Sequence, residues 1–148
     1  MQTERLILRR YRREDLQDLQ ETEQELAERM DSDEMIAIEL KETGKLIGNV
    51  YLGKREFNSL ELGYVFNCSF WGQGYAKESC EAVIRKAFSE GIHWIYAECN
   101  PENPNSWKLL ERLGFTREAH LRQNVSFWTD AQGKPIWKDT FIYGFLNE

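Results

Sequence analysis

The sequence predicts one domain of mixed α/β class, spanning residues 1–148, in which strands and helices alternate in the middle of the chain. Three observations predict this class. Short runs rich in β-branched and aromatic residues are separated by turn residues, as is typical of strands. Between them, two segments carry apolar residues at helical spacing. The length of 148 residues suits one domain with a sizeable core, and no repeat, linker or low-complexity tract divides it.

Composition and charge narrow the classes of function. Apolar and aromatic residues make up 41% of the chain and charged residues 30%, which is ordinary for a soluble globular protein. No apolar run approaches membrane-spanning length and the N-terminus has no secretory pattern, so we expect a cytoplasmic protein without a membrane partner. The net charge of −6 argues against a nucleic-acid partner and is compatible with a cationic substrate.

The cysteines and histidines form no known metal-binding or disulfide pattern. Cys68, Cys80 and Cys99 are odd in number and lack a CxxC pair, so neither a disulfide framework nor a zinc site is expected. The only histidines are His93 and His120, and their spacing does not bring them together. We predict no metal, and we interpret Cys68 and Cys99 as small buried apolar residues.

The first half of the chain reads as a strand, one helix and a hairpin. Leu6–Leu8 form the first strand, and a helix from Tyr11 carries Leu16, Leu19, Leu26 and Met30 on its apolar side until residues 31–33 break it. A strand at 35–40, a turn at 42–45 and a strand at 46–52 follow, with Gly44 supplying the positive φ of the turn. A polar connection over 53–59 leads to the next strand.

The second half alternates strands and helices. We predict strands at 60–66, 93–99, 115–122 and 136–145, a turn at 130–133, and helices from Ala76 to Phe88 and after Asn103-Pro104. Gly91 and Gly114 are the expected left-handed caps of the two helices. The aromatic residues of these elements are predicted to lie in the core, and they are Trp94, Tyr96, Trp107, Phe115 and Trp137.

The most informative stretch is the glycine-bearing turn between strand 60–66 and the helix that follows. Gly72 and Gly74 remove Cβ atoms that would keep a ligand from the backbone. The first helical N–H groups have no partner within the helix, so they favour an anion there. The stretch is neither a dinucleotide-binding fingerprint nor a P-loop, and a turn that merely needs glycine is an alternative.

Four ordered motifs resemble the GNAT acyltransferases, and more narrowly their branch with the ribosomal-protein acetyltransferases RimJ and RimL. They are Glu61-Leu62-Gly63-Tyr64, Trp71-Gly72-Gln73-Gly74-Tyr75-Ala76, Asn103-Pro104-Asn105-Ser106 and Leu110-Glu111-Arg112-Leu113-Gly114-Phe115. Thr3-Glu4-Arg5-Leu6 extends the likeness to the N-terminal strand. The resemblance implies a mostly antiparallel sheet, flanked by helices, with one parallel strand pair that splays apart.

The resemblance also implies acetyl-CoA as the cofactor. Its pyrophosphate would lie on the backbone amides of the turn, and its pantetheine arm would lie between the splayed strands. The residues expected to bind it are Tyr64, Val65, Phe66, Gly72, Gln73, Gly74, Tyr75, Ala76, Lys77, Asn103 and Ser106. Trp71 replaces the Gln or Arg of many relatives, and we interpret it as a mark of the branch.

Two residues are the candidates for catalysis. By resemblance, Glu61 would act as general base through a water, and Ser106 would hydrogen-bond or protonate the departing sulfur. An exposed strand glutamate and a local capping serine are the alternatives, and Asn103 equally suits an N-cap. The tyrosine that many relatives use as the acid is replaced here by Leu110. Asp139 is a weaker candidate to face the acceptor.

The resemblance implies an N-acetyltransferase that moves the acetyl group directly to a primary amine, either a protein α-amino group or a small cationic amine. An acyl-CoA-binding sensor or interaction module without turnover is the alternative. The region 13–33 holds barely one helix where relatives have two. This shortening would leave the acceptor site more open, or completed by a second copy in a homodimer.

Overall fold

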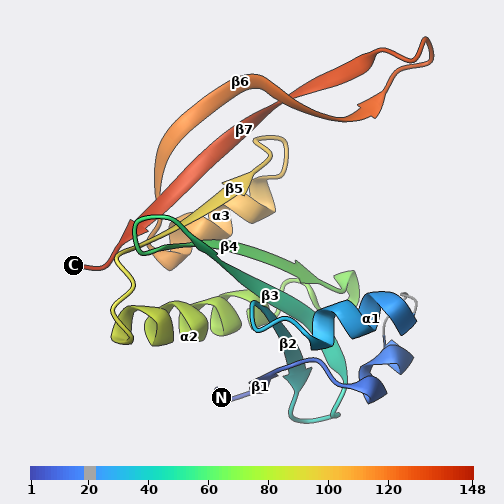
Figure 1. Cartoon of the computed structure of the whole chain (residues 1–148), viewed down its shortest axis with the longest axis vertical. Coiled ribbons are helices and arrows are strands. Elements are labelled where there is room, and N and C mark those ends of the chain that lie inside the picture. Colours follow the sequence, from blue (N-terminus) through green and yellow to red (C-terminus); the bar gives the residue numbers. More distant parts are fainter. Residues whose placement is uncertain (19–22) are drawn as a thin grey trace.

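A computed structural model describes residues 1–18 and 23–148 and shows a mixed sheet with helices on both faces (Figure 1). The described strands are β1 (Leu6–Arg9), β2 (Met35–Leu40), β3 (Leu46–Arg55), β4 (Ser59–Phe66), β5 (Trp94–Cys99), β6 (Thr116–Thr129) and β7 (Pro135–Leu146). The described helices are α1 (Glu23–Met30), α2 (Tyr75–Ser89) and α3 (Pro104–Leu113), with short 3-10 helices at Arg13–Asp18 and Cys68–Phe70. The predicted alternation in the middle of the chain is confirmed as β4, α2, β5 and α3.

The sheet is mostly antiparallel with one parallel pair. Its strand order is β1-β2-β3-β4-β5-β7-β6, and β4 and β5 are the parallel neighbours. Parallel neighbours need a crossover connection, and α2 supplies it. The sheet class that the resemblance implied is therefore confirmed.

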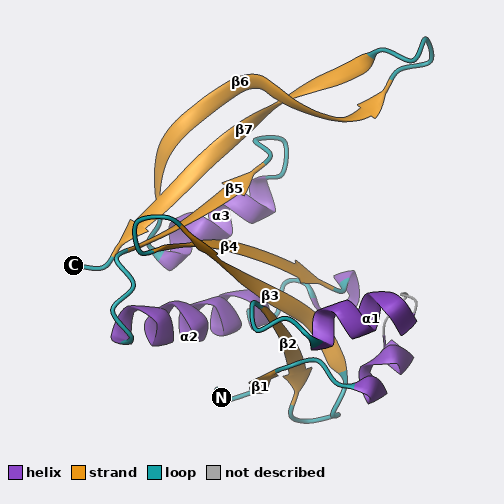
Figure 2. Ribbon diagram, viewed as in Figure 1, coloured by secondary structure: helices purple, strands orange, loops and turns teal. Residues whose placement is uncertain are grey.

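The main core lies between the sheet and the helices α2 and α3. In β2, Ile36 and Ile38 pack toward this core, whereas Ala37 packs with Leu26 of α1. Because successive strand side chains point to opposite faces, α1 covers the face opposite α2 and α3 (Figure 2). The apolar side of α2 includes Cys80, which is fully buried in the main core.

Glycine ends both long helices, as predicted. Gly91 follows α2 with φ +97°, and Gly114 follows α3 with φ +106°. The strands extend somewhat further than their apolar patterns indicate, since β3 continues to Arg55 and β6 to Thr129.

The prediction of one helix after Tyr11 is wrong. A 3-10 helix occupies Arg13–Asp18, where the predicted helix was to begin, and the described part of α1 spans Glu23–Met30, while the predicted apolar position Leu19 lies outside the described residues. Asp15 is buried, and its carboxylate accepts hydrogen bonds from the Arg9 guanidinium at 2.7 and 2.9 Å and from the Arg12 N–H at 2.8 Å. A buried carboxylate needs such partners, so these bonds stabilise the turn.

Two predictions of burial are also wrong. Cys68 is exposed because it lies in the surface 3-10 helix after β4. Trp137 is 54% exposed, together with Phe127 and Trp128, because the distal part of the β6–β7 hairpin extends beyond the helices that cover the rest of the sheet (Figure 1). Phe115 is buried and Trp107 packs against the core as predicted, whereas Trp94 and Tyr96 are only half-buried.

Candidate active site at the parting of β4 and β5

The parallel strands β4 and β5 separate halfway along their length. Their pairing covers Ser59–Glu61 of β4 and Trp94–Tyr96 of β5. Beyond this point β4 continues to Phe66, paired only with β3, and β5 continues to Cys99, paired only with β7. A gap therefore opens between the carboxyl-terminal halves of the two strands.

The backbone of β4 presents polar groups to this gap. The Asn67 N–H donates to the Ile47 carbonyl at 2.9 Å, so residue 67 bonds toward β3. Bonding direction alternates along a strand, and the regular β3–β4 register places Leu62, Tyr64 and Phe66 in the set that points away from β3. Their N–H and C=O groups therefore face the gap, where an amide-bearing ligand can pair with them as an added strand would.

The glycine turn lies at the open end of the gap. Gly72 has φ +76° and Gly74, the residue before α2, has φ +83°. Glycine reaches these left-handed values without the clash that a Cβ causes. The 15-residue helix α2 starts at Tyr75, so its first N–H groups and the positive end of its dipole point at the turn.

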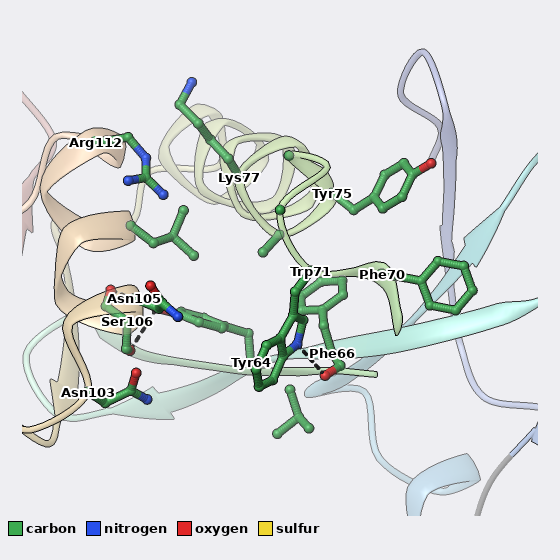
Figure 3. Close-up of a pocket in the computed structure, with 15 residues that line it drawn as sticks. Tyr64, Phe66, Phe70, Trp71, Tyr75, Lys77, Asn103, Asn105, Ser106 and Arg112 are labelled. Atoms are coloured by element: carbon green, nitrogen blue, oxygen red, sulfur yellow. Dashed lines mark hydrogen bonds between the residues drawn. The ribbon is translucent and has the colours of Figure 1, made fainter. Parts of the chain in front are cut away.

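One pocket of about 740 Å³ joins the turn, the gap and the start of α3 (Figure 3). It brings together most of the predicted cofactor-binding residues, namely Tyr64, Val65, Phe66, Gly72, Gly74, Tyr75, Ala76, Lys77, Asn103 and Ser106. Gln73 and Glu61 are not among its lining residues. The side chain of Val65 alternates with those of Tyr64 and Phe66, so the pocket reaches the opposite face of the sheet through the gap.

Ser106 and Tyr64 form a hydroxyl pair in this pocket. The Tyr64 hydroxyl lies 3.0 Å from Oγ of Ser106 and 3.2 Å from the Ser106 carbonyl oxygen (Figure 3). Burial raises the pKa of the Tyr64 phenol to about 12, so the phenol stays protonated at neutral pH. The pair can therefore deliver a hydrogen bond to an atom in the pocket.

The start of α3 contributes further polar groups. Asn103 occupies the N-cap position before Pro104, but its side chain makes no capping hydrogen bond and instead lines the pocket. Asn105 and Arg112 line the pocket as well, and neither was predicted as a site residue from the sequence. Both residues belong to the motifs that resemble the GNAT family, and this membership could have identified them as pocket residues. Arg112 adds a positive charge beside the gap.

Trp71 caps one of the gap-facing carbonyls. Its indole Nε1 donates to the Phe66 carbonyl oxygen at 2.8 Å, although its side chain is largely exposed (Figure 3). The indole lines the same pocket. The Trp71 side chain thus bridges the end of β4 and the glycine turn.

Glu61 lies on the opposite face of β4. It pairs with Tyr96 at the last rung before the strands part, and Nη2 of Arg55 donates to its Oε1 at 2.7 Å. Nη2 of Arg55 also lies 3.3 Å from the Tyr51 hydroxyl. The carboxylate is therefore held at the apex of the gap, on the face away from α2 and α3.

Other candidates contribute nothing to this pocket. Asp139 of β7 accepts from the Gln123 N–H at 2.8 Å and lies 2.7 Å from Nε2 of His120, outside the lining residues. Among the described residues, no cluster of His, Cys, Asp and Glu could hold a metal ion. None of the described helices is long and apolar enough to cross a membrane.

Sequence comparison places these features in a known family. A profile described as "Acetyltransferase (GNAT) domain" matches residues 5–116. The curated relatives include an "Uncharacterized N-acetyltransferase YnaD" of Bacillus subtilis, 29% identical over 80% of this chain and 67% of its own length. A "Probable N-acetyltransferase YjcK" from the same organism is 30% identical over 83% of this chain and 68% of its own. This chain thus spans about two thirds of the length of these relatives.

Solved structures share the fold. An acetyltransferase of the GNAT family from Bacillus anthracis superposes with a TM-score of 0.87 at 24% identity, covering 99% of this chain and 97% of that one. The spermidine/spermine N-acetyltransferase SpeG of Vibrio cholerae gives 0.74 at 22% identity, covering 97% and 93%. A ribosomal-protein-S5-alanine acetyltransferase of Vibrio fischeri gives 0.66 at 23%, covering 77% and 61%. The profile match spans most of the chain, which therefore belongs to the GNAT family of acetyl-CoA-dependent N-acetyltransferases.

Proposed function

We propose that this domain transfers the acetyl group of acetyl-CoA directly to a primary amine, in a ternary complex and without a covalent acyl-enzyme. The observation that carries the proposal is the single pocket in which the glycine turn, the gap-facing backbone of β4 and the Tyr64–Ser106 pair meet. Acetyl-CoA supplies an activated thioester when bound. The rest of the chemistry falls to residues of this chain.

The residues present fit the parts of coenzyme A. The amides from Gln73 to Ala76, at the N-terminus of α2, would hold the pyrophosphate. Leu62, Tyr64 and Phe66 would offer their backbone groups to the two amides of the pantetheine arm. Lys77 and Arg112 line the same pocket and would balance the phosphate charge.

Glu61 would serve as the general base. An amine must lose a proton before or during its attack on a thioester carbonyl. Glu61 lies at the apex of the gap, on the face of the sheet away from α2 and α3. Its position suits proton removal directly or through one water. Arg55 would hold the carboxylate in place through its bond to Oε1.

Ser106 would stabilise the departing thiolate. When the new C–N bond forms and the C–S bond breaks, the sulfur gains a negative charge and then takes a proton. The Ser106 hydroxyl can donate to the sulfur while Tyr64 orients it. Leu110 is 1% exposed and points into the core, so α3 offers no acid at that position.

Direct transfer is supported by the state of the thiols near the pocket. Burial raises the pKa of Cys80 to about 12 and that of Cys99 to about 11. Thiols with such pKa values are protonated at neutral pH and make poor nucleophiles. The exposed Cys68 is not among the lining residues of the pocket. No acyl-cysteine intermediate is therefore expected from these residues.

The acceptor is proposed only as a class. It would be a protein α-amino group or a small cationic amine. Two proteins of similar structure are named as a ribosomal-protein-S5-alanine acetyltransferase and as a spermidine/spermine N-acetyltransferase. The net charge of −6 is compatible with a cationic acceptor. A homodimer that completes the acceptor site, a cytoplasmic location and the absence of a nucleic-acid partner stay predictions.

A thiol-release assay tests the proposal. Purified protein is mixed with acetyl-CoA and with each member of a panel of polyamines, small amines and peptides with free N-termini. We expect free thiol to appear in proportion to one class of amine, with acetylated product in equal amount. CoA binding without amine-dependent release across such a panel would favour the sensor alternative over the transferase.

A further inference from the structure

Arg5, in the N-terminal segment, binds the glycine turn and the start of α2, and it is not among the residues that line the pocket. Its Nε donates to Oε1 of Glu78 at 2.7 Å, its backbone N–H donates to Oε2 at 2.9 Å, and its Nη1 donates to the Gln73 carbonyl at 2.9 Å. The guanidinium also stacks on the Tyr75 ring, with Cζ 4.4 Å from the ring centroid. One side chain thus contacts the turn, the first residue of α2 and the first helical turn.

The bond to the Gln73 carbonyl fixes the direction of the neighbouring N–H. None of the described peptide bonds is cis, and in a trans peptide the C=O and the following N–H point in opposite directions. The Gly74 N–H must then point away from Arg5. Arg5 is not among the residues that line the pocket, whereas Gly74 is.

The hydrogen bond from Arg5 is what fixes the orientation of the Gln73–Gly74 peptide. A flip of this peptide changes ψ of Gln73 and φ of Gly74, and glycine accepts such a change of φ at small cost. A flipped Gln73–Gly74 peptide would present a carbonyl oxygen, rather than an N–H, to an anion. The guanidinium therefore has a role that the glycines themselves cannot supply.

Arg5 also balances the charge of Glu78. This carboxylate lies in the first turn of α2, where its negative charge interacts favourably with the helix dipole but would repel a bound anion. Thr3 donates to the same carboxylate through its hydroxyl. The N-terminal segment thus occupies the carboxylate with three donors, on the side away from the pocket.

We propose that Arg5 is a positioning residue for the anion site: it locks the Gln73–Gly74 peptide with its N–H toward the pocket and neutralises Glu78 behind it. The inference rests on the proposed function, because it takes the turn as the pyrophosphate site. It adds that a residue just before β1, 68 positions earlier in the chain than Gln73, helps to assemble the site. Arg5 would act through the turn, without touching the ligand.

Calorimetric titrations of Arg5→Lys test this role. Lysine keeps the charge but cannot span Glu78 and the Gln73 carbonyl together, nor stack as a plane on Tyr75. We expect the Kd for CoA and for dephospho-CoA to rise roughly tenfold, about 1.4 kcal/mol. The Kd for pantetheine, which lacks the pyrophosphate, should not change. In turnover, KM for acetyl-CoA should rise while kcat at saturation stays.

Arg10→Lys is the matched control. Arg10 also pairs with a carboxylate, that of Asp33 at 2.9 Å, and donates to a backbone carbonyl, that of Met30 at 2.9 Å. This variant should leave the Kd values for CoA, dephospho-CoA and pantetheine unchanged. An unchanged Kd for CoA in Arg5→Lys, or an equal loss for pantetheine, would overturn the inference. A wild-type protein that binds no CoA would instead reject the proposed function.

Discussion

The two faces of β4 meet the same gap but are built differently. Toward α2 and α3, Tyr64 and Phe66 line a covered pocket, and the backbone groups of β4 that point away from β3 face the gap beside it. On the other face, Glu61 and Val65 lie on a surface that neither α2 nor α3 covers, and Val65 is 67% exposed. Here the chemistry depends on individual side chains such as the Glu61–Arg55 pair.

This difference separates the part of the site that suits the cofactor from the part that suits the acceptor. Backbone amides and glycines can bind one constant ligand whatever the neighbouring side chains are, so the covered face suits the cofactor. Side chains on an open face can vary with the acceptor without disturbing the fold. Variants of the covered face should therefore change cofactor affinity, and variants of the open face should change turnover.

Gly74→Glu should have the largest effect and tests the covered face. The variant places a side chain at φ +83°, within 3.3 Å of Nη2 of Arg5, and adds negative charge to the anion site. We expect CoA affinity to fall by at least about a hundredfold, since strain of about 1–3 kcal/mol adds to electrostatic repulsion. Isothermal titration with CoA measures it.

Gly133→Glu is the control for backbone strain. Gly133 has φ +78° at the tip of the β6–β7 hairpin, and nothing lies within 4 Å of its added Cβ. It should bind CoA like the wild type. Normal CoA binding by Gly74→Glu would show that the turn is not the anion site.

Glu61→Gln should have the next largest effect and tests the open face. Removing the base should lower kcat about a hundredfold, the lower part of the range for general base catalysis, while the Kd for CoA stays unchanged. Glu98→Gln, on the neighbouring strand β5, should be nearly neutral because Glu98 lies beyond the last paired rung. Steady-state kinetics at saturating acetyl-CoA compare the two, and equal losses would remove Glu61 from its proposed role.

Ser106→Ala and Tyr64→Phe test the hydroxyl pair of the covered pocket, which is proposed to act in turnover rather than in cofactor binding. Each should lower kcat about tenfold, since a hydrogen bond to a charged atom is worth about 1.5–3 kcal/mol and water can partly replace it. Because the two hydroxyls are 3.0 Å apart and act as one unit, the double variant should lose little more than either single variant. Fully additive losses in the double-mutant cycle would show that the hydroxyls act independently.

Glu78→Gln should have the smallest effect and concerns stability. Burial acts to raise the pKa of Glu78, but hydrogen bonds from Thr3 and Arg5 outweigh it and hold this pKa below its ordinary value. A lowered folded-state pKa stabilises the protein above the unfolded value of about 4.3, and the contribution is lost as the pH falls through the folded pKa. The melting temperature of Glu78→Gln should therefore lie below that of the wild type at pH 7, and the two should converge as the pH falls through the lowered pKa of Glu78. A difference that persists unchanged at low pH would contradict this origin.

Local patterns predicted the strands, the helices and the glycine turn because each depends on residues close in sequence. Positive φ was predicted for Gly44 from its turn and for Gly91 and Gly114 from the helix boundaries, and all three are confirmed. The resemblance then added the splayed pair and most of the pocket residues. Ser106 and Tyr64 were named separately, but their contact joins residues 42 apart and has no local signature.

The predictions that were wrong depend on tertiary contacts. The helix after Tyr11 gives way to a 3-10 turn because buried Asp15 binds Arg9. Trp137 alternates like a core residue, yet its strand extends past the covering helices. The grip of Arg5 on the turn spans 68 to 73 residues, so only the folded chain reveals it.

Amide chemical-shift mapping with CoA tests the central claim most directly. On titration, the N–H signals of Tyr64 and Phe66 and those from Gly74 to Ala76 should shift most, because these groups face the gap and the turn. The N–H groups of Glu61 and Gly63 point toward β3 and should shift less. Shifts that are concentrated elsewhere, with the turn and the even-numbered residues of β4 unaffected, would contradict the assignment of this pocket to acetyl-CoA.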